Sequence, residues 1–241
     1  MIEKLILENF LIIDIETVSA KSDFKELHED WKQLWQDKVI KTIPPGISVE
    51  EYYLQRAGVM AEFSKVVCIS LGYFKKEKEV LNFRVTSIFD HDEKIVLNLF
   101  IETINKMHTA KKNWILAGHN IREFDVPFLC RRLLINGIAI PQYLNFQNMK
   151  PWETNLVDTF QYWRFGDYKN FTSLNLLAAS LNVPSPKDDI NGSMVGSVYW
   201  KENDLQRIAT YCQKDIVTVA NIILRFKNLP LLLNEEVIFI K

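Results

Sequence analysis

The sequence contains no long hydrophobic run and no segment typical of export. No apolar stretch approaches the roughly 18 residues that a membrane-spanning helix needs. The N-terminal residues MIEKLILENF carry acidic side chains within a short apolar stretch, which is not the pattern of a signal peptide. We therefore expect a cytoplasmic protein with no membrane partner.

Cysteine is scarce, and neither sign of charge is in excess. The cysteines are widely spaced beside apolar residues, which predicts buried, reduced thiols instead of a disulfide frame or a zinc site: Cys68, Cys130 and Cys212. The 29 basic and 30 acidic residues leave a net charge of −1. This balance argues against a protein that coats nucleic acid through bulk electrostatics. It leaves open a small site whose positive charge comes from metal ions.

The chain is long enough for one large domain, and no repeat or low-complexity linker divides it. We expect a single domain over residues 1–241. The predicted strands lie at about 10–16, 65–74, 80–88, 114–117 and 155–157. The predicted helices lie at about 93–107, 126–136, 173–181 and 202–226, with a helical pair inserted within about 20–62. This order predicts an α/β fold, in which a mixed five-stranded sheet is flanked by helices and the pair is inserted after the first strand.

Two local patterns predict helix starts, and a third predicts core packing. Ser48 with Glu51, and Asp90 with Glu93, have the spacing of a capping box. Within the insertion, four aromatic residues occur at helical spacing. For these we favour core packing over a surface for base stacking: Trp31, Trp35, Tyr52 and Tyr53.

Two carboxylates end the first predicted strand, in the stretch LIIDIETVSA. Side chains at positions i and i+2 of a strand point the same way, so Asp14 and Glu16 would lie side by side. Two ionised carboxylates at that range repel each other unless positive charge lies between them. A basic side chain or a hard divalent cation such as Mg²⁺ or Mn²⁺ would supply it.

A third acid, Asp125, lies between a predicted strand and a predicted helix. Its structural interpretation is strong, because Asp is a preferred N-cap and Pro127 is well tolerated in a first helical turn. The stretch also follows the C-terminal end of a strand, where open α/β sheets collect ligand-binding groups.

A fourth acid, Asp215, follows Tyr211 by four residues on a long predicted helix. This spacing places both side chains on one face, although a solvated Asp beside a half-buried Tyr is a common arrangement. Strand-end and loop positions explain three other acids: Asp158, Asp188 and Asp189.

The combination of these residues is more specific than any one of them. DIET (14–17), NIREFD (120–125) and YCQKD (211–215) resemble the three motifs of the DEDD exonucleases. Tyr211 fits the tyrosine subgroup, since the histidine subgroup would have His at position 210, which is Thr. From about Phe10 to Phe226, the chain is similar to the proofreading exonuclease domain of family B DNA polymerases and to free-standing bacterial relatives. Glu123 is a departure, because the polymerase domains usually have Asn there.

The resemblance implies an RNase H-like fold and a metal-dependent 3′-5′ exonuclease of DEDDy type. It implies two divalent cations, Mg²⁺ or Mn²⁺, held by the carboxylates of Asp14, Glu16, Asp125 and Asp215, with Tyr211 orienting the attacking water. The implied partner is the 3′ end of a nucleic acid, with DNA favoured. Near the terminal nucleotides the resemblance places the Thr17 backbone, Asn120 and Phe124.

Two alternatives to a DNA exonuclease remain open. One is a metal-dependent nuclease that acts on RNA, as a 3′-5′ exoribonuclease, or on small nucleotide products. The other is a catalytically silent module that binds nucleic acid or a protein partner. The presence of all four acids and Tyr211 disfavours the silent module. Four basic residues are candidate phosphate contacts, although a solvated surface is favoured for each: Lys150, Arg164, Lys169 and Lys187. The sequence identifies no protein partner.

Overall fold

The computed structural model describes residues 2–111, 113–150, 153–184 and 190–240. Three residues considered above lie outside these ranges: Lys187, Asp188 and Asp189. Within the described ranges, no helix combines the length and the apolar character needed to cross a membrane. The three cysteines are free thiols, as predicted, and Cys130 is only partly buried.

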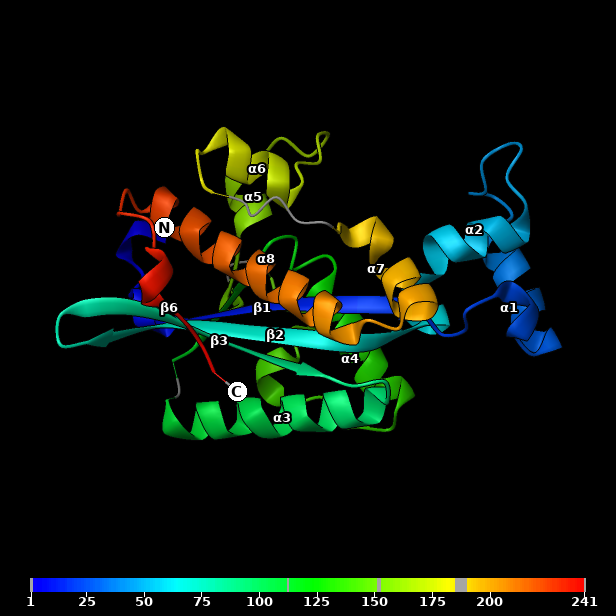
Figure 1. Cartoon of the computed structure of the whole chain (residues 1–241), viewed down its shortest axis with the longest axis horizontal. Helices are drawn as coiled ribbons and strands as arrows, with labels where there is room; N and C mark the ends of the chain where they lie inside the picture. The colour runs from blue at the N-terminus through cyan, green and yellow to red at the C-terminus, as the bar shows by residue number, and fades with distance from the viewer. Residues whose placement is uncertain (1, 112, 151–152, 185–189, 241) are drawn as a thin grey trace.

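One mixed sheet forms the centre of the molecule, and its strand order is β5-β4-β1-β2-β3-β6 (Figure 1). The strands are β1 (Phe10–Ser19), β2 (Ser64–Glu77), β3 (Val80–Phe89), β4 (Ile115–Gly118), β5 (Leu156–Asp158) and β6 (Val237–Phe239). β2 is antiparallel to β1 and to β3, and the other neighbouring pairs are parallel. The predicted mixed sheet is confirmed, with a sixth strand. β6 has three residues, too few to show the alternation that identifies a strand in a sequence.

Helices cover both faces of the sheet (Figure 1). One face carries α3 (Glu93–Ala110) and α4 (Asp125–Ile135), and the other carries the long α8 (Leu205–Phe226). The shorter α5 (Thr159–Trp163), α6 (Leu174–Ser180) and α7 (Val195–Ser197) lie on the α8 side. The apolar run of β1 serves both layers, because Leu11 and Ile13 pack with α3 and α4, whereas Phe10 and Ile12 pack with α8.

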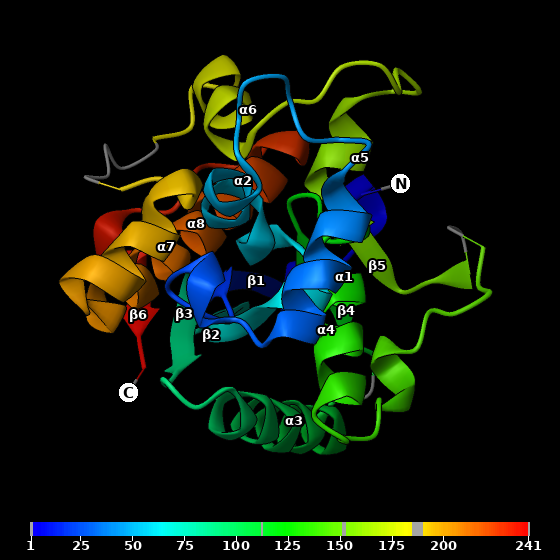
Figure 2. The ribbon, with the colours of Figure 1, turned by 90° about the vertical axis from the view of Figure 1, so that its right-hand side faces the viewer.

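The inserted helical pair, α1 (Glu29–Val39) and α2 (Val49–Arg56), has a small core of its own. It lies at one end of the sheet (Figure 2). Trp35 is fully buried, with its ring centroid 5.2 Å from that of Tyr53 and 5.1 Å from that of Phe63. Core packing is thus confirmed for Trp35, Tyr52 and Tyr53, whereas Trp31 is 44% exposed. The Ser48 hydroxyl accepts a hydrogen bond from the Glu51 N–H, so this predicted helix start is also correct.

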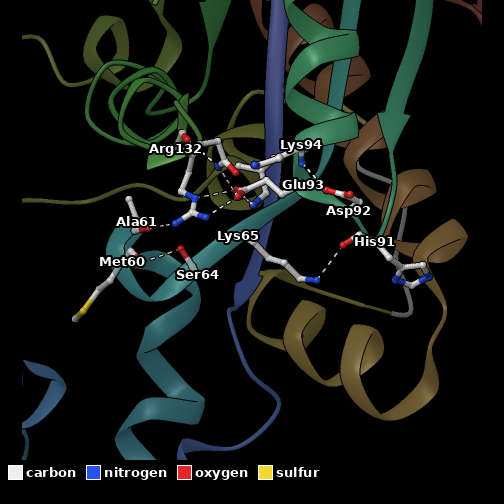
Figure 3. Close-up of polar contacts among 11 residues, drawn as sticks. Met60, Ala61, Ser64, Lys65, His91, Asp92, Glu93, Lys94 and Arg132 are labelled. Atoms are coloured by element: carbon white, nitrogen blue, oxygen red, sulfur yellow. Dashed lines mark hydrogen bonds and ion pairs between the residues drawn. The ribbon is translucent and has the colours of Figure 1, made fainter. Parts of the chain in front are cut away.

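The predicted capping box of Asp90 and Glu93 is wrong. Asp92 is the N-cap of α3, and its carboxylate accepts a hydrogen bond from the Lys94 N–H. Glu93 points into the protein, where its carboxylate accepts hydrogen bonds from the Arg132 guanidinium of α4 and from the Val66 N–H of β2 (Figure 3). A local pattern cannot show that a distant arginine competes for the same carboxylate.

This buried ion pair connects α4 to the rest of the fold. Arg132 also donates one hydrogen bond to the Ala61 carbonyl, just after the inserted pair (Figure 3). The Asn136 side-chain amide donates to Glu93 as well. Both charged side chains are about nine-tenths buried, so the loss of one partner would leave an uncompensated buried charge. The pair therefore holds α4, which begins at Asp125, in a defined position.

Candidate active site

β1 extends past its neighbour β4, and this leaves one edge of the strand open where the acids begin. The two strands are paired only from Phe10 with Ile115 to Ile12 with Ala117. On its other edge β1 stays paired with β2, and the register shifts between Glu16 and Thr17. Bulges of this kind change the direction of side chains and are common beside active sites. The end of β1 thus presents two carboxylates together with backbone groups that β4 does not pair.

Asp14 and Glu16 continue the face of β1 that packs against α8. The alternation that places Phe10 and Ile12 on that side places both acids there too. Glu16 is 8% exposed, whereas Asp14 is less deeply buried. The structure therefore brings the pair together on one face, as the sequence indicated.

Asp125 reaches the same point of β1 from the opposite side. It is 3% exposed and is the first residue of α4, and its Oδ1 atom accepts a hydrogen bond from the Ile15 N–H at 3.2 Å. The N-cap position belongs to Phe124, whose side chain makes no capping hydrogen bond. Asp125 is therefore not the N-cap that the structural interpretation of the sequence favoured. Its carboxylate instead bonds the backbone of β1 between Asp14 and Glu16.

Tyr211 and Asp215 lie one turn apart on α8, and both are partly exposed. Their spacing places the Tyr211 hydroxyl beside the Asp215 carboxylate, whose charge acts on it. Burial raises the pKa of Tyr211, and the negative charges of Asp215, Glu16 and Asp14 raise it further. The phenol thus remains protonated at neutral pH and can donate a hydrogen bond, but it is a poor base.

The acids influence one another strongly. Burial raises the pKa of Asp14 and Glu16 well above the usual range. The charges of Asp125 and Asp215 raise that of Asp14 further, and those of Asp14 and Asp215 act on Glu16. Burial also raises the pKa of Asp125 to about 7, although the hydrogen bond from Ile15 opposes this. Such effects weaken with distance, which indicates that Asp125 and Asp215 lie near the Asp14–Glu16 pair. These four residues are called the acidic cluster below.

Three of the clustered acids, Asp14, Glu16 and Asp125, form no ion pair with a lysine, arginine or histidine side chain of the described residues. Of the two sources of positive charge considered from the sequence, a basic side chain is thus excluded for these three acids in the described part of the chain. Oxygen-rich sites of this kind suit hard cations such as Mg²⁺ and Mn²⁺.

Cys212 contacts Asp14 in this site, and the sequence did not predict this contact. Its thiol lies between α8 and β1, with Sγ 3.2 Å from an Asp14 carboxylate oxygen, and ligand atoms of Asp14, Glu16 and Cys212 all lie within 4.8 Å of one another. Burial raises the pKa of the thiol, so it stays protonated and donates to Asp14. Its position directly after Tyr211 was the available signal, but a cysteine on an apolar helix face is usually core.

The three residues expected near the terminal nucleotides lie in the segments that carry the acids: Thr17 follows Glu16 on β1, and Asn120 and Phe124 precede Asp125. The Thr17 hydroxyl donates to the Gly58 carbonyl at 2.6 Å. Asn120 has a left-handed backbone (φ +60°), and its buried Oδ1 atom has no hydrogen-bond partner among the described residues. Phe124 is half-buried, with its ring centroid 5.2 Å from that of Phe128. The unpaired Asn120 oxygen is the one of these groups that most clearly lacks an internal role.

Asp158 holds the loop that carries Asn120. This carboxylate is 5% exposed and accepts hydrogen bonds from the N–H groups of Asn120 and Arg122, as well as capping α5 through the Phe160 N–H. Its position at a strand end was predicted. The bonds to the 120–122 loop were not, because they join segments that lie far apart in the chain.

The basic residues differ from one another. The solvated surface favoured for Lys150 and Lys169 fits their exposure. For Arg164 it is wrong, since its side chain is only 13% exposed. The Arg164 guanidinium pairs with Glu123 at 3.3 Å and lies over the rings of Phe160 and Tyr168. Glu123, the departure from the polymerase pattern, is thus the partner of this arginine.

Comparisons with known proteins agree with the geometry. The sequence profile of one family, described as a predicted 3′-5′ exonuclease related to the exonuclease domain of PolB, matches residues 59–238. That match includes Asp125, Tyr211 and Asp215 and begins after Asp14 and Glu16. No curated protein matches the sequence.

One solved structure shares the fold over most of the chain. The family B DNA polymerase from the hyperthermophilic archaeon Pyrobaculum calidifontis is similar over 91% of the chain, with a TM-score of 0.50 and 17% identity. The matched region spans 24% of that polymerase chain.

Proposed function

Because the chain belongs to the family of predicted 3′-5′ exonucleases related to the exonuclease domain of PolB, we propose that it hydrolyses single-stranded DNA from the 3′ end with the help of two divalent cations. We further propose that residues 1–241 act as one exonuclease domain of DEDDy type. The observation that carries the proposal is the gathering of acids at the end of β1. Ligand atoms of Asp14 and Glu16 lie within 4.8 Å of each other, and the Asp125 carboxylate bonds the Ile15 N–H between them. The charge of Asp215 on α8 acts on both Asp14 and Glu16.

The donor set fits the proposed cations. All four acids offer carboxylate oxygens, which Mg²⁺ and Mn²⁺ prefer. Asp14, Glu16 and Asp215 would hold one cation, and Asp14 with Asp125 would hold the other. Bound there, the cations would supply an activated water and would neutralise the charge that develops on the leaving 3′ oxygen. They would also reverse the local sign of charge, so that a polyanion can approach.

The protein's own groups would position the reactants. The Tyr211 hydroxyl, which stays protonated beside Asp215, would orient the attacking water. The Ile15 N–H holds the Asp125 carboxylate, and the Cys212 thiol holds that of Asp14. Asn120 Oδ1 and the Phe124 ring would contact the terminal nucleotides. Such fixed geometry is a large part of what an enzyme contributes to a reaction rate.

The chemistry at the phosphate would be the same for RNA. Discrimination would require a contact that accepts or rejects the 2′-hydroxyl. No described group is assigned to that contact, so DNA is preferred on the family relationship alone.

The direct test compares 5′-labelled single-stranded DNA and RNA of equal sequence, incubated with the full chain and Mn²⁺ or Mg²⁺. We expect a ladder of DNA products shortened from the 3′ end, which EDTA abolishes. Faster loss of the RNA would replace DNA with RNA as the substrate. Stable DNA and RNA in both metals would contradict the proposed function.

A further inference from the structure

Three aromatic side chains project from the loop that joins α5 to α6. Phe165 is 86% exposed, Tyr168 is 77% exposed and Phe171 is 66% exposed. Phe165 and Tyr168 are the most exposed large apolar side chains in the described ranges. Single exposed apolar residues are ordinary, but three within seven residues indicate a contact surface.

The rings are supported from within, so they form a defined surface. The Phe171 centroid lies 5.0 Å from that of Phe160, and the Phe165 centroid lies 6.1 Å from that of Tyr162. The Arg164 guanidinium lies 4.5 Å from the Tyr168 centroid. Each exposed ring thus has one neighbour on the protein side and is otherwise open to a ligand.

The backbone of this loop is strained at Phe165, and a hydrogen-bonded turn follows. Phe165 has φ +45°, which is uncommon for a bulky side chain, and Gly166 follows with φ +89°. The carboxylate of Asp167 accepts hydrogen bonds from the Lys169 N–H and the Asn170 amide and so closes the turn. Backbone strain of this kind clusters at active sites and ligand-binding sites.

Several contacts tie this loop to the segment that leads into Asp125. Arg164 pairs with Glu123, two residues before Asp125. The two ring nitrogens of His119 hydrogen-bond the Thr172 carbonyl at 2.9 Å and the Thr159 hydroxyl at 3.0 Å. Helices α5 and α6, on either side of the loop, lie on the α8 side of the sheet (Figure 1). The alternation of β1 directs Asp14 and Glu16 to the same side.

We propose that Phe165, Tyr168 and Phe171 form a base-stacking surface for single-stranded nucleic acid on the 5′ side of the nucleotide that is removed. This inference rests on the proposed function, which places the 3′ end at the acidic cluster. Only unpaired bases present open faces to protein rings, and stacking tolerates any base. Lys169, exposed in the same loop, adds a positive charge suited to the phosphate backbone. A nuclease that accepts any sequence needs contacts of this kind.

The test uses the full chain with all three residues changed to Ala, and binding of a 5′-fluorescein single-stranded 20-mer DNA is measured by anisotropy with Ca²⁺ in place of Mg²⁺. Stacking of one base is worth roughly a fivefold to hundredfold change in affinity. We expect the Phe165→Ala, Tyr168→Ala, Phe171→Ala protein to bind at least about tenfold more weakly.

Two control proteins separate ring stacking from other effects. Phe239→Ala removes a 57% exposed ring from β6, at the opposite edge of the sheet from β5, and should leave binding unchanged. A triple Leu protein keeps apolar side chains at the three positions but has no ring faces, so it should bind as weakly as the triple Ala protein. Unchanged melting temperatures would show that all variants fold.

Hydrolysis of two substrates separates this proposal from the proposed function. The p-nitrophenyl ester of thymidine 5′-monophosphate reaches the acids but not the loop, so wild-type and triple Ala proteins should hydrolyse it equally. For the 20-mer, the variant should show a raised KM and an unchanged kcat. If wild type hydrolyses neither substrate but the rings are needed for binding, the proposed function fails and the stacking surface stands.

Three results would overturn the stacking surface. The first is tight 20-mer binding by the triple Ala protein, and the second is no binding by wild type. The third is a triple Leu protein that binds as well as wild type. If the Ala substitutions also changed the sedimentation of the protein while DNA binding was retained, the loop would be a protein interface instead.

Discussion

The carboxylate of Asp125 accepts a hydrogen bond from the backbone N–H of Ile15, which lies between Asp14 and Glu16 on β1. This bond joins residues that are 110 positions apart in the chain. It is possible because β4 ends before it can cover that part of the β1 edge. The acidic cluster therefore depends on the junction between β4 and α4 as much as on the motifs themselves.

Replacing an acid should stabilise the metal-free protein. Asp14→Asn keeps the side-chain shape and removes a carboxyl group whose ionised form is disfavoured by burial and by the neighbouring acids. We expect its Tm in EDTA to rise, by roughly 2–4 °C for each kcal/mol of relieved repulsion. Mn²⁺ should raise the Tm of wild type and have little effect on that of the variant. Asp37→Asn changes an exposed acid on α1 and is the matched control. If Mn²⁺ raised the Tm of wild type, Asp14→Asn and Asp37→Asn equally, the result would argue against a metal site at Asp14.

Stability without metal should fall as the pH rises. The folded-state pKa of Asp125 is about 7, whereas an unfolded Asp titrates near about 3.9. The folded chain thus binds more protons between these values, and stability is lost as the pH increases from about 4 to 7. The raised pKa values of Asp14 and Glu16 act in the same direction. Melting curves in EDTA at pH 5 to 8 check this, and a Tm that rises over this range would contradict it.

Metal binding should oppose that loss, because cations bind the ionised carboxylates. Stabilisation by Mn²⁺ should accordingly be larger at pH 8 than at pH 5.

Tyr211→Phe should lower turnover with little effect on substrate affinity. The substitution removes only the hydroxyl that lies beside Asp215 and that we assign to the attacking water. We expect kcat on single-stranded DNA to fall at least about tenfold, with KM changed much less. Tyr143→Phe removes a hydroxyl that bonds Asn105 instead and should leave both constants unchanged. A rise in KM alone would show that Tyr211 contributes to binding of the DNA substrate instead.

Gly118→Ala should damage the site without touching an acid. An added Cβ would lie 2.9 Å from the Ile13 carbonyl and 2.8 Å from Ile121 Cβ, so the loop that leads to Asp125 must move. Strain of this kind costs about 1–3 kcal/mol of stability, and kcat should fall because Asp125 is displaced. Gly196→Ala meets nothing within 4 Å and is the control. Full activity in Gly118→Ala would show that the loop tolerates the movement.

The features that the sequence predicted correctly follow from local regularity. The apolar run that precedes Asp14 has the pattern of a buried strand, and the Tyr211–Asp215 spacing fits one face of a helix. The features that were missed depend on contacts between distant segments. Glu93 has the spacing of a cap but binds Arg132, and Asp125 could have capped α4 but binds β1. Arg164 was expected in solvent and instead pairs with Glu123 and lies against aromatic rings.

Asp14→Asn and Asp215→Asn provide the most direct test of the account, through their hydrolysis of 5′-labelled single-stranded DNA in Mn²⁺. If the gathered acids hold the cations that drive the reaction, both variants should lose activity by several orders of magnitude while their melting curves show a folded protein. Asp37→Asn should retain wild-type activity. Wild-type product ladders from either Asp14→Asn or Asp215→Asn would contradict the central claim.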